Sequence, residues 1–172
     1  MYLHYKEICM IIRKAERRDI QALLDIYNYE VENTTATFDL NKKTLEQWTT
    51  WFENHNIGNH PLIVAEVDGA LAGYASLSTY REKEAYKSTV ELSVYVATTF
   101  RRQGVATSLM SEILRLAKED EITHTVVSVI TSENNESVRL HEKFGFKYSG
   151  TIHEVGVKFG RYLGISNYEL QV

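Results

Sequence analysis

One segment, Thr89–Glu119, constrains the fold more than any other part of the chain. Apolar and polar residues alternate over Thr89–Val96, which predicts a strand with two distinct faces. After Gly104 the apolar side chains recur at helical spacing, so a long amphipathic helix is expected. The start of such a helix offers unpaired N–H groups and the positive end of its dipole, which predicts a pyrophosphate site. Arg101 and Arg102 would add positive charge there.

The spacing of this segment leaves a simpler interpretation open. A single glycine such as Gly104 most often marks an ordinary turn, here with two solvated arginines before it. The segment lacks the G-x-G-x-x-G pattern of dinucleotide-binding folds and the G-K-[ST] of P-loops. A Rossmann-type oxidoreductase is therefore disfavoured.

The remaining periodicity predicts strands joined mostly as hairpins, with helices inserted between some of them. Thr44 and Gln47 form the capping-box pattern that begins a helix, and Asp68-Gly69 suits a tight hairpin turn. The expected fold class is α/β, in the α+β sense: a mixed, mostly antiparallel central sheet with helices on both faces. The expected strands cover residues 11–13, 62–67, 70–79, 89–96 and 126–130, one begins at 146 and one lies within 162–170; the expected helices cover 20–31, 44–54, 104–119 and 137–144.

Length and composition predict one domain. The 172 residues suit a single core, and 44% apolar with 24% charged residues is ordinary for a globular protein. We expect residues 1–10 to form a loose N-terminal extension, with Met10 as an alternative start, and residues 11–172 to form the domain. The opening stretch has no cleavage pattern and is too short to span a bilayer, so no membrane association is expected.

Charge and cysteine content limit which ligands and which cellular location are expected. The net charge of −4 removes the electrostatic drive for nucleic-acid binding. Cys9 is the single cysteine of the sequence, so we expect no internal disulfide, no metal site and a cytoplasmic location.

Several motifs in chain order resemble the GNAT acyltransferase superfamily. Arg101-x-x-Gly104-x-Ala106 matches its [RQ]-x-x-G-x-[GA] acetyl-CoA motif, in which Ala106 replaces the commoner glycine. The wider pattern resembles the phosphinothricin N-acetyltransferase branch, although Leu92 stands where many relatives have histidine. The supporting pieces are Ile26-Tyr-Asn28, Thr35-Ala-Thr-Phe38, Ser88-Thr-Val-Glu91, Ser93-Val-Tyr-Val96, Leu140-His-Glu-Lys143, Gly145-Phe146 and Glu154-Val-Gly-x-Lys158-Phe-Gly-Arg161.

The resemblance implies an N-acetyltransferase that moves acetyl from acetyl-CoA to the amine of a small, amino-acid-like acceptor of the phosphinothricin or methionine sulfone/sulfoximine type. It also implies a homodimer, since relatives are often dimers, and a strand that binds the pantetheine arm through backbone groups. Two alternatives stay open: a protein or peptide N-acetyltransferase, and a non-catalytic acyl-CoA-binding module. The expected cofactor-binding residues are Val94, Tyr95, Val96, Arg101, Arg102, Gln103, Gly104, Val105, Ala106, Thr107, Asn134 and Ser137.

Glu91 is the candidate general base. Attack on a thioester needs a neutral amine, and amines are mostly protonated at neutral pH, so a positioned base must accept a proton. Glu91 lies on a strand expected to be central, where a carboxylate is unusual. A surface glutamate on a half-exposed strand is the alternative, and the resemblance favours the catalytic role.

His141 is the second candidate catalytic residue. With Asn134 and Ser137 it shares one face of a short helix, and the resemblance places it near the sulfur, where it could donate a hydrogen bond to the departing thiolate. A solvated or capping histidine is the alternative. A guanidinium grips a carboxylate through two bonds, so Arg81 leads the acceptor-binding candidates. The expected acceptor-binding residues are Arg81, Tyr86, Phe38 and Lys158.

Overall fold

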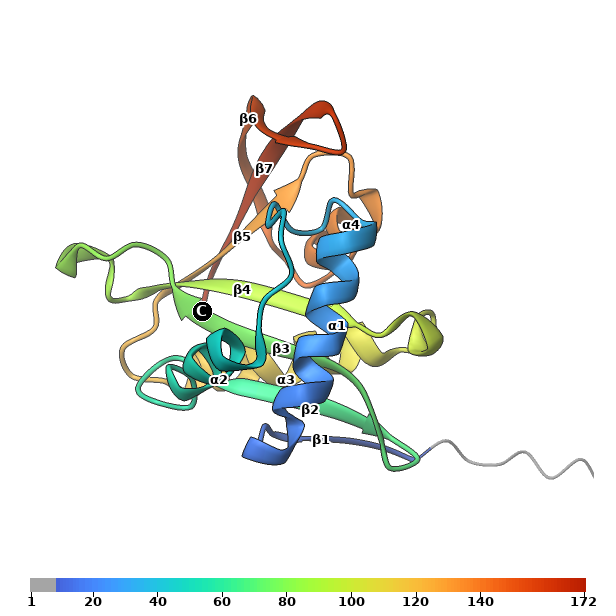
Figure 1. Cartoon of the computed structure of the whole chain (residues 1–172). Coiled ribbons are helices and arrows are strands. Elements are labelled where there is room, and N and C mark those ends of the chain that lie inside the picture. Colours follow the sequence, from blue (N-terminus) through green and yellow to red (C-terminus); the bar gives the residue numbers. More distant parts are fainter. Residues whose placement is uncertain (1–8) are drawn as a thin grey trace, which may run out of the picture.

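The structure, a computed structural model, describes residues 9–172 and is built on one seven-stranded sheet (Figure 1). The strand order is β1-β2-β3-β4-β5-β7-β6, and every neighbouring pair is antiparallel except β4 and β5. The mixed, mostly antiparallel sheet expected from the sequence is confirmed. The strands are β1 (Met10–Lys14), β2 (Leu62–Val67), β3 (Ala70–Thr79), β4 (Thr89–Val96), β5 (Thr125–Thr131), β6 (Lys147–Lys158) and β7 (Arg161–Gln171).

Helices cover both faces of the sheet, as predicted. Two of them, α1 (Ile20–Asn33) and α2 (Leu45–Glu53), pack on the face that carries Tyr74. The other face is covered by α3 (Val105–Glu119), and apolar side chains of α4 (Asn135–Lys143) join the same core. The capping box at the start of α2 forms as expected, because Gln47 N donates to Thr44 Oγ1 at 3.2 Å while Thr44 N donates to Gln47 Oε1 at 2.9 Å.

The sheet opens in its middle, between β4 and β5. These two strands pair only at their beginnings, from Thr89↔Thr125 to Glu91↔Val127. Beyond that point β4 stays paired with β3 as far as Val96, and β5 stays paired with β7 as far as Thr131. Because alternate backbone groups of a strand point to each side, the second half of β4 directs unpaired amides and carbonyls into the gap.

On the other side of β4, the backbone approaches β3 closely at Gly73. A Cβ atom on Gly73 would lie 2.6 Å from the carbonyl oxygen of Tyr95 and 3.3 Å from a methyl group of Leu109. No side chain fits at this position without moving one strand. The glycine therefore sets how tightly the second half of β4 lies against β3.

The N-terminal boundary differs by one residue from the prediction. Met10 is the first residue of β1 and pairs with Val67, although it was expected to belong to a loose extension. Pairing with β2 extends the ordered edge of the sheet to this residue. The rest of the expected extension, apart from Cys9, lies outside the described residues. Among the helices of residues 9–172, none has the length and apolar character needed to cross a membrane.

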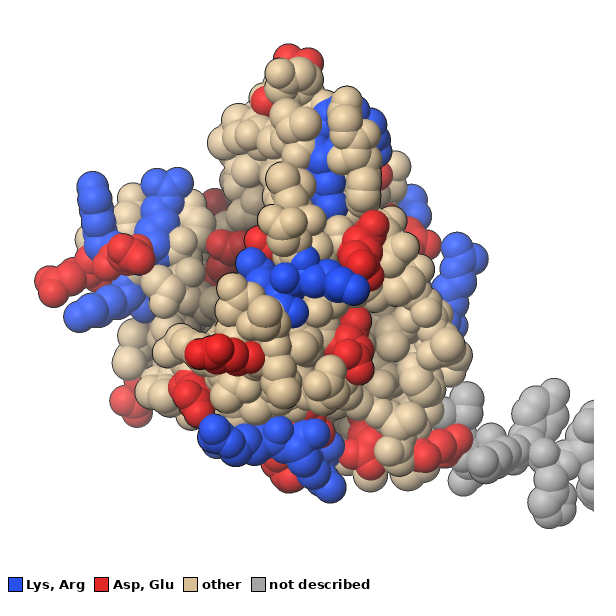
Figure 2. All heavy atoms as spheres, in the orientation of Figure 1, with Lys and Arg blue, Asp and Glu red and all other residues tan. Residues whose placement is uncertain are grey.

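The surface carries charges of both signs. In the view of Figure 2, Lys and Arg side chains lie among Asp and Glu rather than in one basic area, and the part formed by β6 and β7 is mostly uncharged. That hairpin exposes large apolar side chains although β6 is an edge strand. The expected homodimer stays a prediction. The exposed apolar residues of the hairpin are Tyr148, Ile152, Val155, Val157, Phe159 and Tyr162.

Candidate active site

A cavity of about 1010 Å³, called here the larger cavity, lies where the end of β4 meets the start of α3 and the flank of α4. It brings together all the predicted cofactor residues except Gln103, whose side-chain amide donates to the carbonyl of Thr99 at 3.0 Å. The predicted residues in its lining are Val94, Tyr95, Val96, Arg101, Arg102, Gly104, Val105, Ala106, Thr107, Asn134, Ser137 and His141.

The turn before α3 has the backbone geometry of an anion site. Gly104 caps the helix in the left-handed region, with φ 81° and ψ 1°, and Arg102 two residues earlier has φ 60°. A Cβ on Gly104 would meet nothing within 4 Å, so its backbone conformation, rather than crowding within the protein, favours glycine. The first residues of α3, Val105 to Thr107, line the larger cavity, and the first N–H groups of a helix have no helical acceptor, which suits a pyrophosphate.

The two arginines of this turn differ in their partners and in their exposure. Arg101 forms an ion pair with Glu30 of α1, whose side chain is only 5% exposed, and its Nε donates to the carbonyl of Val96 at 3.3 Å. Arg102 is 88% exposed and makes one long contact of 3.4 Å with Glu136. Arg102 is therefore free to turn toward phosphate, and Arg139, which the sequence did not suggest, also lines the cavity.

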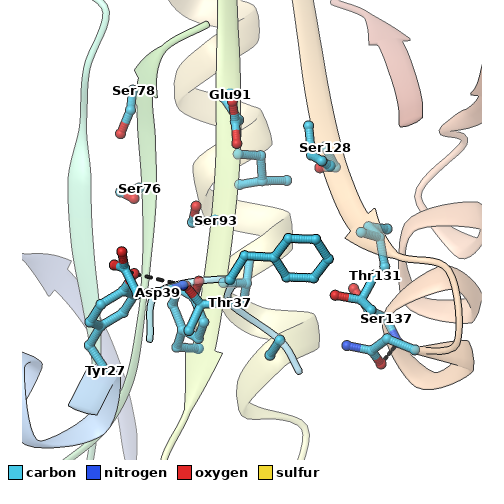
Figure 3. A pocket seen from close by; sticks show the side chains of 18 of the residues that line it. Tyr27, Thr37, Asp39, Ser76, Ser78, Glu91, Ser93, Ser128, Thr131 and Ser137 are labelled. Atoms are coloured by element: carbon cyan, nitrogen blue, oxygen red, sulfur yellow. Dashed lines mark hydrogen bonds between the residues drawn. The ribbon is translucent and has the colours of Figure 1, made fainter. Parts of the chain in front are cut away.

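A second cavity of about 530 Å³, the smaller cavity, lies on the α1 and α2 side of the β4–β5 gap. Figure 3 shows Ser76 and Ser78 of β3, Glu91 and Ser93 of β4, and Ser128 of β5 along it. The two cavities share part of their lining, so a thioester arm that follows the gap would bring its reactive end to the smaller one. The shared residues are Ala36, Val94, Tyr95, Asn134, Ser137 and His141.

Glu91 lies in the smaller cavity at the point where β4 and β5 separate. Burial raises the pKa of its carboxyl, and among residues 9–172 no hydrogen bond or ion pair offsets that effect. A partly buried carboxylate without a protein partner is uncommon in a structural role. The arrangement suits a group that accepts a proton from a bound molecule.

His141 lies on α4 in the lining of both cavities and is 5% exposed. Burial lowers the pKa of its imidazole, which favours the neutral ring. Its Nδ1 lies 2.7 Å from the carbonyl oxygen of Ser137, and a carbonyl can only accept, so Nδ1 carries the proton. Nε2 is then an acceptor, and His141 could donate to a thiolate through Nε2 only after taking up a proton.

Of the four predicted acceptor-binding residues, Phe38 alone lines the smaller cavity. Phe38 lines the smaller cavity, and its ring lies so close to Gly156 of β6 that a Cβ there would be 2.5 Å away. Lys158 is 3% exposed, and its Nζ donates to the carbonyl of Thr37 at 2.7 Å. Arg81 lies 5.2 Å from the ring of Tyr80 and 5.7 Å from that of Tyr86. Arg81, Tyr86 and Lys158 line neither cavity.

The smaller cavity has walls that sequence reasoning missed. Tyr27 and Trp48 stack with their ring centres 4.5 Å apart, and Tyr95 meets Tyr27 edge-on at 5.5 Å. The sequence placed Tyr27 in the Ile26–Asn28 motif and Trp48 in the helix predicted for 44–54, but assigned neither to the site. Asp39 and Lys43 also line the cavity, and the one available signal was the position of Asp39 directly after the Thr35–Phe38 motif.

Comparisons with known proteins agree with this geometry. Residues 22–146 match the model of the acetyltransferase (GNAT) family. The chain belongs to the GNAT acetyltransferase family. Acetyl-CoA is therefore its acyl donor, as the larger cavity and the open start of α3 suggest, and the expected fold and enzyme class are confirmed.

Three relatives show how far the similarity extends. The phosphinothricin N-acetyltransferase of Streptomyces coelicolor is 38% identical over 162 residues, 92% of this chain and 94% of that protein. The L-methionine sulfoximine/L-methionine sulfone acetyltransferase of Salmonella typhimurium is 34% identical over 163 residues, 95% of each chain. The solved structure of yncA from Salmonella typhimurium with its cofactor acetyl-CoA superposes with a TM-score of 0.90 at 34% identity, covering 94% of this chain and 93% of that one.

Proposed function

We propose that this enzyme acetylates the α-amine of a small amino acid or amino-acid analogue of the phosphinothricin or methionine sulfone/sulfoximine type, with Glu91 as general base. The observation that carries the proposal is the meeting of the two cavities beside an unpartnered, partly buried carboxylate. Relatives named for those two acceptor types match nearly the whole chain.

The reaction needs no covalent enzyme intermediate. The acceptor nitrogen attacks the thioester carbonyl carbon while Glu91, directly or through a water molecule, takes the proton from nitrogen. Backbone N–H groups of β4 near Val94 can donate to the oxyanion that forms. The carbon–sulfur bond then breaks, and coenzyme A leaves as a thiolate that is protonated to the thiol. The proton lost by the amine balances the one gained by sulfur.

The smaller cavity favours a small acceptor over a protein N-terminus or a lysine side chain. Its volume of about 530 Å³ falls within the usual range of small-molecule sites. The ring of Phe38, packed against Gly156, and the aromatic wall around Trp48 line it. A peptide would have to enter past these groups as an extended chain.

An activity screen tests the proposal. The purified protein is mixed with acetyl-CoA and either single amino acids, including L-methionine sulfone and phosphinothricin, or short peptides, and free thiol is measured. We expect acceptor-dependent thiol release with at least one of the amino-acid acceptors and acetylated product in the mass spectrum. Turnover of the peptides alone would instead favour a protein acetyltransferase, and uptake of acetyl-CoA with no turnover of any amine would favour a binding module.

A further inference from the structure

Lys43 is the one lysine or arginine among residues 9–172 that lines the smaller cavity. The cations that the sequence suggested for an acceptor carboxylate lie elsewhere. Arg81 belongs to the loop after β3, and the Nζ of Lys158 is buried against backbone carbonyls. An anionic group inside the cavity would therefore find its cation at Lys43.

The backbone of Lys43 is held in place from both sides by one side chain of α1. The Nδ2 of Asn28 donates to the carbonyl of Lys43 at 3.0 Å, and the N–H of Lys43 donates to the Oδ1 of Asn28 at 2.8 Å. This pair of bonds joins the loop before α2 to α1. It fixes the point from which the lysine side chain starts.

The ammonium group of Lys43 forms an ion pair with Asp39, four residues earlier in the chain. Its Nζ lies 3.0 Å from Asp39 Oδ1, while the hydroxyl of Tyr27 donates to Asp39 Oδ2 at 2.5 Å. The Asp39 N–H donates to the hydroxyl of Thr37 at 3.2 Å, and that hydroxyl also contacts the Tyr27 hydroxyl at 2.9 Å. Each oxygen of the carboxylate thus has a partner, and Lys43 has N–H donors left over.

The Lys43 head group can be reached by a bound molecule. The side chain of Lys43 is 32% exposed, and that of Asp39 is 36% exposed. Figure 3 shows Asp39 and Tyr27 across the cavity from Thr131 and Ser137. Tyr95, which lines both cavities, has its ring 5.5 Å from that of Tyr27.

We infer that Lys43, positioned by Asn28 and by the Tyr27–Asp39 pair, binds the α-carboxylate of the acceptor and so selects amino acids over simple amines. In an amino acid the amine and the carboxylate share one carbon, so the cation must lie close to where the amine reacts. Lys43 lines the same cavity as Glu91, the proposed base. The inference rests on the proposed function, because it assumes that the acceptor is an amino acid.

The test compares two acceptors that differ only in the carboxylate: L-methionine sulfone and 3-(methylsulfonyl)propylamine. In Lys43→Met we expect KM for L-methionine sulfone to rise by about 10- to 100-fold, as for the loss of a charged hydrogen bond, with little change in kcat. The amine without a carboxylate should show the same KM in wild type and variant. Lys43→Arg should recover part of the affinity.

Lys42→Met is the matched control. Lys42 is the neighbouring lysine, its side chain is 56% exposed, and it pairs with Glu32 at 2.9 Å outside the cavity. Its loss should leave both KM values unchanged. Thermal melting and acetyl-CoA titration of each variant confirm that the fold and the donor site are intact.

The outcomes separate the two proposals. An unchanged KM for L-methionine sulfone in Lys43→Met, or an equal rise for both acceptors, overturns the role of Lys43 and leaves the proposed function standing. If wild-type protein acetylates no amino acid of the panel, the proposed function fails, and the role of Lys43 fails with it.

Discussion

Arg101 lies in the motif that the sequence assigned to cofactor binding, yet its side chain also forms an ion pair with the buried Glu30. The substitution Arg101→Met measures how much this ion pair contributes to stability. The substitution leaves the carboxylate of Glu30, only 5% exposed, with a hydrogen bond from Thr34 at 2.7 Å but without its ion-pair partner. Removing one partner of a buried pair costs about 3–5 kcal/mol. Because Arg101 is itself 44% exposed, we expect about 2 kcal/mol, or a fall in Tm of about 4–8 °C for a chain of this size.

The assay is urea unfolding together with thermal melting, with two comparisons. Glu30→Gln in the Arg101→Met background removes the unpaired charge and should restore most of the lost stability. Arg102→Met, in the same turn but 88% exposed, should leave the melting temperature within about 1 °C while weakening acetyl-CoA binding. A melting temperature unchanged by Arg101→Met, or no recovery in the double variant, would refute the assignment of Arg101 to the buried pair.

Three further predictions follow from other parts of the molecule. For Asp19, burial opposes ionisation, but the hydrogen bonds from Arg13 at 2.8 and 2.9 Å and from the Glu16 N–H outweigh it and lower the pKa of the carboxyl. The stability that ionised Asp19 contributes is therefore full above about pH 4 and is lost as pH falls through the lowered pKa. The urea midpoint should drop in that range, and it should drop less in Asp19→Asn. Because burial raises the pKa of Glu91 and the base must be ionised, kcat should rise with pH through a value above that of an ordinary glutamate, and Glu91→Gln should abolish that limb. Gly73→Ala would put a Cβ 2.6 Å from a backbone oxygen, so the free energy of unfolding should fall by about 1–3 kcal/mol in urea.

Local signals in the sequence were enough to predict most of the elements. β2, β3 and β4 have the predicted bounds, because alternation of apolar residues and the turn at Asp68-Gly69 define a hairpin without distant contacts. The start of α2 follows from the capping box at Thr44. Element ends set by pairing with distant strands, such as Met10 opposite Val67, could not be found in this way.

The parts of the site in which a motif fixes the backbone geometry could be predicted from the sequence. The parts that depend on contacts of long side chains with residues distant in the sequence could not. The turn at Gly104 falls at the helix start for a local reason, the left-handed conformation of one residue. Lys158 lies inside a family motif and was therefore predicted to bind the acceptor, whereas Lys43 lies outside the motifs and was not. Only the contact of Lys158 with Thr37, and that of Lys43 with Asn28 and the cavity, shows which one a ligand can reach.

The proposed reaction depends on Glu91 as the proton acceptor, and single-turnover kinetics of Glu91→Gln test this role most directly. Enzyme loaded with acetyl-CoA is mixed with L-methionine sulfone, and the rate of acetyl transfer is compared with that of wild type. We predict a rate about 10²- to 10⁴-fold lower, with acetyl-CoA affinity unchanged, because the variant keeps the size of the side chain and loses the base. Transfer at the wild-type rate would contradict the central claim that Glu91 takes the proton from the attacking amine.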